Sequence, residues 1–243
     1  MGTWEFYTEV LIPVLNRGLL LSIKIIIPSA ILAVLLGILT GAGRAAGPSW
    51  LKKPLDLYVA IFRGTPLVVQ LTMWYFGLTS ATRWLQPLFE PMGLPAWTWM
   101  MFTMRPFTAA IFSFALCGAA YHSEYIRGAL LSVKKGQFLA AQSLGFTKLQ
   151  TFLYITAPVA LRRAVPGCGN ELIYLIKYSS LAILVTLKEL TGSSKHIASL
   201  YFRHLECYFL TALYYLAMVT IATWLLNRLE RFLTLPGLGR YDA

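Results

Sequence analysis

Charged residues are scarce in this sequence, and acidic ones are the scarcest. Of the 243 residues, 13% are charged and 57% are hydrophobic, and the mean hydropathy is +0.62. In soluble globular proteins about a quarter of the residues are charged. The balance is therefore too apolar for an ordinary soluble domain, and it predicts one integral membrane domain covering residues 1–243.

The shortage of acidic residues leaves a formal net charge of +11, from 21 Lys and Arg against 10 Asp and Glu. Such a charge also occurs in nucleic-acid-binding proteins, where the basic residues gather on one face or in one tail. Here the basic residues lie between long apolar segments instead. We therefore attribute them to membrane topology and expect no nucleic acid among the partners.

Cysteine and histidine are rare as well, with three of each. The cysteines stand alone in or near apolar segments, at Cys117, Cys168 and Cys207. Because they show no C-x-x-C or Cys/His spacing, they are predicted to be free structural thiols. The histidines are isolated too, at His122, His196 and His204. Interfacial or structural roles are favoured for them, and no metal site is predicted.

The motifs of several large enzyme classes are missing. The sequence contains no Walker A loop, no G-x-S-x-G, no H-E-x-x-H and no pair of carboxylates at a spacing suited to catalysis. We therefore predict no catalytic residues and no cofactor in this chain, so any ATP is bound by partner subunits. Two classes of membrane protein stay open as alternatives to a subunit that works with a separate ATPase. One is a membrane-embedded enzyme, which the missing catalytic groups disfavour. The other is a secondary carrier, a class that commonly has internal repeats and more spans.

Long apolar runs are what the sequence has in abundance. A helix needs about 20 apolar residues to cross a membrane. Five segments qualify, at residues 18–42, 55–78, 107–125, 165–187 and 207–228. The predicted fold class is therefore an all-α integral membrane protein with five transmembrane helices. Pro28 and Pro66 lie inside apolar runs, and we expect each to kink its helix.

Basic residues are distributed unequally over the two sides of this five-span arrangement. The connections that share a side with residues 128–158 carry twelve Lys and Arg, against six on the other side. The more basic side of a membrane protein usually faces the cytoplasm. The N-terminus is therefore predicted outside, and the C-terminus and residues 128–158 are predicted in the cytoplasm.

Residues 128–158 form the one long polar interruption of the apolar sequence. Gly145 can adopt the left-handed conformation that closes a helix. Thr147 and Gln150 have the spacing of a capping box, which predicts the start of a second short helix. Its apolar stripe consists of Leu149, Phe152 and Leu153, and Pro158 should end or bend it. We interpret this segment as a docking surface for a cytoplasmic partner.

A loop motif and three further segments carry a resemblance to a known family. Ala140 and Ala141, followed at fixed distances by Gly145, Ile155 and Pro158, resemble the "EAA" loop of the membrane subunits of bacterial ABC importers. The segments at residues 62–71, 122–133 and 161–173 resemble the polar-amino-acid branch, the histidine- and glutamine-type permeases. The resemblance covers about residues 15–235.

This resemblance implies a type I ABC importer transmembrane domain whose cytoplasmic loop carries a coupling helix. It implies import of a polar amino acid across the bacterial inner membrane, along a path formed with a second permease subunit, the same or similar. Further implied partners are a cytoplasmic ABC ATPase dimer, an extracytoplasmic substrate-binding protein and membrane lipid. The implied ATPase-docking residues are Ala140, Ala141, Gly145, Phe146, Leu149 and Pro158, with Leu139 in place of the usual glutamate.

Polar groups within the fourth apolar run are the candidates for the substrate path, because a charge in the hydrocarbon region is costly unless it faces a partner or a water-filled cavity. The candidates are Lys177, Ser179, Ser180, Asn170 and Glu171. The serine hydroxyls can satisfy backbone groups where a helix loosens. A buried ion pair or a packing role stays open for these residues.

Two further sites of charge are expected at the membrane surface. Glu124 and Arg127 lie about one helical turn apart, so we expect an ion pair that positions the cytoplasmic loop. Arg63 precedes Gly64, Thr65 and Pro66, and we expect it at a helix break or at a contact between subunits rather than in contact with the substrate.

Overall fold

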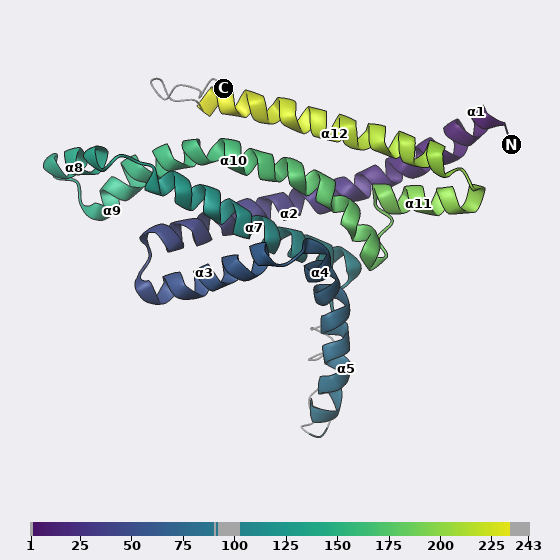
Figure 1. The fold of residues 1–243 in the computed structure, drawn as a ribbon, viewed down its shortest axis with the longest axis horizontal. Helices are drawn as coiled ribbons and strands as arrows, with labels where there is room; N and C mark the ends of the chain where they lie inside the picture. Colours follow the sequence, from purple (N-terminus) through teal and green to yellow (C-terminus); the bar gives the residue numbers. More distant parts are fainter. Residues whose placement is uncertain (1, 90, 92–102, 234–243) are drawn as a thin grey trace.

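The computed structural model describes residues 2–89, 91 and 103–233, and every long element in these ranges is a helix (Figure 1). The first half contains α1 (Thr3–Glu5), η1 (Phe6–Leu11), α2 (Ile12–Ala46), α3 (Ser49–Gly64), α4 (Leu67–Thr72), η2 (Met73–Gly77) and α5 (Leu78–Phe89). The second half contains α7 (Pro106–Leu131), α8 (Lys135–Ser143), α9 (Lys148–Thr151), η4 (Phe152–Thr156), α10 (Ala157–Tyr178), η5 (Ser179–Val185), α11 (Leu190–Tyr201) and α12 (His204–Leu233).

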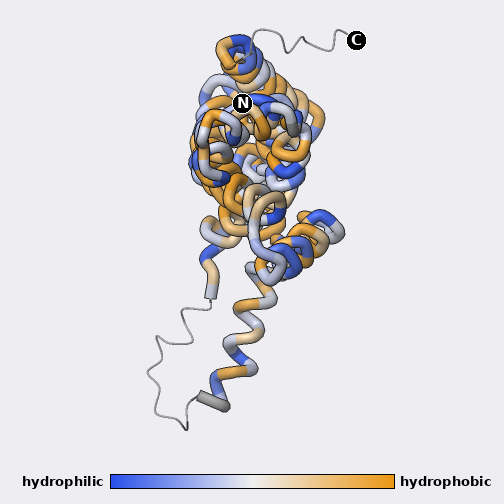
Figure 2. The backbone as a smooth tube through the Cα atoms, turned by 90° about the vertical axis from the view of Figure 1, so that its left-hand side faces the viewer, coloured by the Kyte–Doolittle hydropathy of each residue, from blue (hydrophilic) through white to orange (hydrophobic). Residues whose placement is uncertain are grey.

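The long helices α2, α7, α10 and α12 run lengthwise through one bundle, with α3 beside them (Figure 1). The short helices α8 and α9 lie at one end of the bundle, and α11 lies with the N-terminus at the other end. Helix α5 projects away from the bundle in both views (Figures 1 and 2). Hydrophobic residues predominate in the bundle, whereas the arm formed by α5 alternates in hydropathy (Figure 2).

Small residues bring α2 and α7 together. A Cβ atom added at Gly37 would lie 2.4 Å from the Cβ atom of His122, and one added at Gly41 would lie 2.9 Å from the carbonyl oxygen of Ser123. The buried face of α7 is rich in alanine, including Ala109, Ala110, Ala115, Ala119 and Ala120. Close backbone approach is the usual basis of helix packing in membranes, where lipid is as apolar as the side chains.

Three helical runs in the described part of the chain are long and apolar enough to cross a membrane, namely Thr3–Ala46, Lys148–Val185 and His204–Leu233. They contain the first and fifth predicted spans and all but the last two residues of the fourth. The third predicted span lies inside α7, and the second is divided between α3, α4 and η2. The predicted helical fold is therefore confirmed. The number of membrane crossings stays a prediction.

Pro66 interrupts its helix instead of kinking it. Thr65 has φ −114° and ψ 143°, an extended conformation that a following proline favours, so α3 ends at Gly64 and α4 begins at Leu67. The Nε2 atom of Gln70 donates hydrogen bonds to the carbonyl oxygens of Phe62 at 2.8 Å and Thr65 at 3.0 Å. The side chain of Gln70 thus satisfies backbone groups that the break leaves open. Pro28, by contrast, lies inside the uninterrupted helix α2.

The local predictions for residues 128–158 are confirmed at the corner between the two short helices. Gly145 has φ 87°, in the left-handed region. The backbone N–H of Thr147 donates to Oε1 of Gln150 at 2.9 Å, and the N–H of Gln150 donates to Oγ1 of Thr147 at 3.3 Å, which completes the capping box. Pro158, however, does not end the second helix, because α9, η4 and α10 follow one another without a break. The π-helical turn of η4 directly before it accommodates the missing N–H.

Candidate functional site

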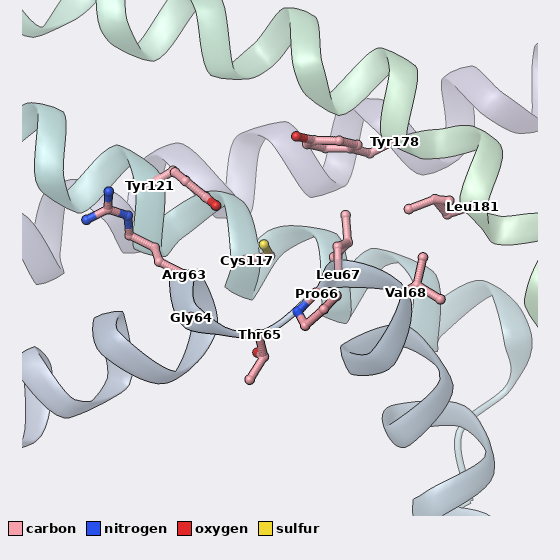
Figure 3. Close-up of a pocket in the computed structure, with 10 residues that line it drawn as sticks. All are labelled: Arg63, Gly64, Thr65, Pro66, Leu67, Val68, Cys117, Tyr121, Tyr178 and Leu181. Atoms are coloured by element: carbon pink, nitrogen blue, oxygen red, sulfur yellow. The ribbon is translucent and has the colours of Figure 1, made fainter.

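A cavity of about 470 Å³ lies where α3 ends and α4 begins, against α7 and the junction of α10 with η5. The break at Pro66 forms one wall, because the extended backbone there leaves room that a continuous helix would fill. Ten residues line the cavity: Arg63, Gly64, Thr65, Pro66, Leu67, Val68, Cys117, Tyr121, Tyr178 and Leu181 (Figure 3).

The two ends of this cavity differ in chemistry. Arg63 and Tyr121 lie together at one end, and Val68 and Leu181 lie at the other (Figure 3). The guanidinium carbon of Arg63 lies 5.3 Å from the centre of the Tyr121 ring, a cation–π contact. Among the residues that line the cavity Arg63 alone carries a charge. A molecule with an anionic group at one end and an apolar part at the other would fit this arrangement.

The charge of Arg63 belongs to a cluster of ion pairs behind the cavity wall. Arg63 Nη1 lies 3.1 Å from Oε1 of Glu124, and Arg44 Nη2 lies 3.1 Å from the same oxygen. Arg127 Nη1 lies 3.9 Å from Oε2 of Glu124, so the predicted pair of Glu124 with Arg127 forms but is the longest of the three. Arg44 also pairs with Asp56 at 2.7 Å. The cluster joins α2, α3 and α7.

The five path candidates in the fourth apolar run lie outside the cavity wall. Glu171 and Ser179 are buried, whereas Lys177 and Asn170 are exposed and Ser180 is half-buried. Lys177 Nζ lies 5.2 Å from the centre of the Tyr174 ring. It is Tyr178, between the candidates, that reaches the cavity. Their role in a substrate path stays a prediction.

The loosening expected at the serines is present. At Ser179 the α-helix changes to the 3-10 helix η5, which ends at Thr186 in the left-handed conformation with φ 65°. The hydroxyl of Ser179 donates to the carbonyl oxygen of Ile176 at 2.7 Å, and that of Ser180 donates to the carbonyl oxygen of Lys177 at 2.8 Å. The change of helix type turns Leu181 towards the cavity.

At the far end of the bundle, α8, α9 and η4 carry exposed apolar side chains. Among the six predicted docking residues Leu149 and Phe146 are exposed at 67% and 37%, Ala140, Gly145 and Pro158 are also exposed, and Ala141 is buried. Two residues that the sequence did not single out, Leu144 and Tyr154, are 79% and 70% exposed. This apolar surface, named here the docking surface, consists of Leu139, Leu144, Phe146, Leu149, Leu153 and Tyr154.

A polar contact holds the docking surface to the bundle. Arg163 Nη1 on α10 donates to the carbonyl oxygen of Ser132 at 2.7 Å and to its Oγ atom at 2.9 Å. Because Ser132 caps the end of α7, this contact ties α7 and α10 together where both enter the loop. In the described ranges no group of three His, Cys, Asp or Glu is placed to hold a metal ion. The absence of a metal site stays a prediction.

The roles of two residues behind the cavity wall were not predicted from the sequence. Arg44 counted only towards the topology, although its side chain is 7% exposed and bridges two acidic residues. Gln70 belonged to a recognised motif. Its role as a cap was not predictable, because its side chain reaches the carbonyl oxygens of Phe62 and Thr65 only where the helix is interrupted at Pro66. A polar residue four positions after a proline in an apolar run was the available signal.

Comparison with known proteins identifies a protein family that matches this chain. A family model described as "Binding-protein-dependent transport system inner membrane component" matches residues 33–235. The glutamine transport system permease protein GlnP of Escherichia coli (strain K12) is 34% identical over 221 residues, which cover 90% of this chain and 93% of that protein. The octopine transport system permease protein OccM of Rhizobium meliloti is 32% identical over 227 residues, covering 93% of this chain and 86% of that protein.

Solved structures share the fold. A crystal structure of an amino acid ABC transporter with histidines superposes with a TM-score of 0.77 at 27% identity, covering 95% of this chain and 99% of that chain. The inward-facing MetNI methionine ABC transporter superposes with a TM-score of 0.72 at 18% identity, covering 97% and 100%. The second likeness extends to the fold alone.

Proposed function

This chain belongs to the family of binding-protein-dependent transport system inner membrane components, and on that premise we propose that it is the transmembrane subunit of an ATP-driven importer of a polar amino acid. The resemblance read from the sequence motifs is confirmed by the family model and by the related permeases. The protein is therefore an integral inner membrane component of a transport system, with the fold of the ABC importer permeases.

An amino acid as cargo is supported by the cavity at the helix break, and its polar class is supported by the related permeases. The one charged lining residue of the cavity is Arg63, which suits a carboxylate, and the opposite end is apolar. The cavity of about 470 Å³ accommodates a molecule of this size. The related permeases are named for glutamine and octopine transport, and the superposed structure is that of an amino acid transporter.

The proposed partners follow from the family of the chain, and the docking surface supports one of them. A cytoplasmic ATPase dimer binds and hydrolyses ATP and packs on the docking surface, whose six apolar side chains are between 37% and 79% exposed in the described part of the chain. A second permease subunit, the same or similar, completes the path, and an extracytoplasmic binding protein delivers substrate. The N-terminus lies outside and the C-terminus in the cytoplasm, as the charge distribution favours. This chain itself performs no catalysis.

Coupling runs through one continuous helical segment. The run Lys148–Val185 begins at the docking surface with Leu149 and ends at the cavity with Tyr178 and Leu181. A displacement imposed on the docking surface by the ATPases therefore moves two residues of the cavity wall. ATP drives transport in this scheme because the ATPases interact differently with the inward- and outward-facing states.

The test is reconstitution of the complete complex in proteoliposomes with a panel of labelled amino acids. We expect uptake of at least one polar amino acid that requires both ATP and the binding protein. Uptake that persists without ATP and follows an ion gradient would identify a secondary carrier. Chemical conversion of the amino acid by the purified chain would identify a membrane enzyme.

A further inference from the structure

We propose that Glu124 is a positioning residue that holds the guanidinium of Arg63 at the cavity, where Arg63 receives the carboxylate of the transported amino acid. The inference rests on the proposed function, and it goes beyond it by assigning one residue to the substrate's carboxylate and another to its placement. The experiment below distinguishes a failure of this inference from a failure of the proposed function.

A single oxygen atom links the cavity to the interior of the bundle. Oε1 of Glu124 lies 3.1 Å from Nη1 of Arg63 and 3.1 Å from Nη2 of Arg44. The side chain of Arg63 is 42% exposed, that of Glu124 is 29% exposed and that of Arg44 is 7% exposed. The three residues thus form a chain from the cavity wall to a buried anchor.

The anchor is fixed from several sides. Besides Glu124, Arg44 binds Oδ1 of Asp56 through Nε at 2.7 Å and Oγ of Ser123 through Nη1 at 3.1 Å. With its guanidinium engaged by three side chains, Arg44 has little freedom to move. Glu124 therefore occupies a defined position, and it transmits that position to Arg63.

Arg63, which lines one end of the cavity, retains hydrogen-bonding capacity beyond its contact with Glu124. A guanidinium carries five N–H donors in a planar fork. Glu124 engages Nη1, and the Tyr121 ring covers one face at 5.3 Å, so the placement is set by two contacts. Glu171 lies within electrostatic range of Arg63 but forms no ion pair with it in the described part of the chain. The remaining donors suit a carboxylate, which a guanidinium binds with two parallel hydrogen bonds.

A purely structural ion pair is the alternative, and it makes a different prediction. If Glu124 only stabilised the fold, its removal would weaken every ligand equally or reduce assembly. If Glu124 positions Arg63, its removal weakens binding specifically through the carboxylate. The decisive readout is therefore the ratio of affinities for an amino acid and for the same amino acid with its α-carboxylate converted to an amide.

The experiment measures binding of L-glutamine and L-glutaminamide, and of L-arginine and L-argininamide, to the purified permease–ATPase complex without binding protein. We expect the wild-type complex to prefer the free acid by about tenfold or more, the range of a charge-assisted contact. Arg63→Ala should remove this preference. Glu124→Gln should reduce it several-fold, and Glu124→Asp, which keeps the charge, should restore part of it.

Control variants distinguish the proposed role of Glu124 from the general effect of removing an ion pair. Glu206→Gln on α12 removes an ion pair of 3.4 Å with Arg203 and should leave the ratio unchanged. If Glu124→Gln fails to assemble, Glu124→Asp and Arg63→Lys still test the proposal, since each should lower the ratio. An unchanged ratio in these variants would overturn the role of Glu124 while leaving the proposed importer intact. A wild-type complex that transports no amino acid would instead overturn the proposed function.

Discussion

The docking surface and the cavity are built in opposite ways. The docking surface comes from one stretch of chain, and its geometry is set by neighbours: a left-handed glycine, a capping box and an apolar stripe. The cavity comes from three stretches, since residues 63–68 face Cys117 and Tyr121 on α7, and also Tyr178 at the end of α10 and Leu181 in η5. The first can be damaged by one backbone change, whereas the second depends on caps and ion pairs between helices.

The largest expected effect concerns the cap of the helix break at the cavity. Gln70→Ala leaves the carbonyl oxygens of Phe62 and Thr65 without their donor, which we expect to destabilise the protein by about 3 kcal/mol. Gln150→Ala is the matched change on the docking side, at an exposed capping box, and should cost about 1 kcal/mol or less. Thermal unfolding of both detergent-solubilised variants measures the difference. Equal losses would show that the two caps are equivalent.

The next effect concerns the backbone of the docking side. A side chain at Gly145 meets no atom within 4 Å, so Gly145→Val acts through its φ of 87° alone. The strain of about 1–2 kcal/mol should weaken ATPase binding about tenfold and reduce coupled uptake. Gly145→Asn should be milder, because asparagine tolerates this conformation.

Gly136 supplies the control for this prediction. It also has open space around it but lacks a positive φ, so Gly136→Val should bind the ATPase nearly as well as the wild type. Co-purification of the ATPase with each variant measures the effect. Similar losses in both valine variants would contradict the backbone explanation.

A smaller effect is expected from one exposed side chain of the docking surface. Leu149 is 67% exposed, so Leu149→Ser should weaken ATPase binding several-fold while leaving thermal stability unchanged. Leu216 on α12 is 62% exposed and lies in the candidate membrane span His204–Leu233. Leu216→Ser should leave ATPase binding intact. If both substitutions weakened binding alike, the docking surface would be wrongly assigned.

The smallest effect on amino acid binding should come from the predicted path lysine. Lys177 is exposed and lies outside the cavity wall, whereas its neighbour Tyr178 lines it. Lys177→Ala should therefore change amino acid binding by less than about threefold. Transport should still be impaired if Lys177 belongs to the substrate path. Tyr178→Ala should weaken binding more. Binding assays on the assembled complex compare the two, and a larger loss for Lys177→Ala would place the path along the exposed face of α10.

The sequence predicted what depends on near neighbours. Gly145, the capping box and the loosening at Ser179 were predictable because each needs only residues within one or two helical turns. The cavity was not, since the ion pairs of Glu124 with Arg44 and Arg63 cross 80 and 61 positions of sequence. Pro66 was recognised as a disturbance, but whether it kinks or breaks the helix depends on the side chain of Gln70.

One native residue allows the central claim to be tested directly, namely that the run Lys148–Val185 links the docking surface to the cavity. Cys117 lines the cavity, Cys207 is fully buried, and Cys168→Ala removes the third thiol. The rate at which a small thiol reagent modifies Cys117 should change when ATP binds the partner ATPases, and this change should be lost in Gly145→Val. A rate that is the same with and without ATP in the transport-competent complex would contradict the account.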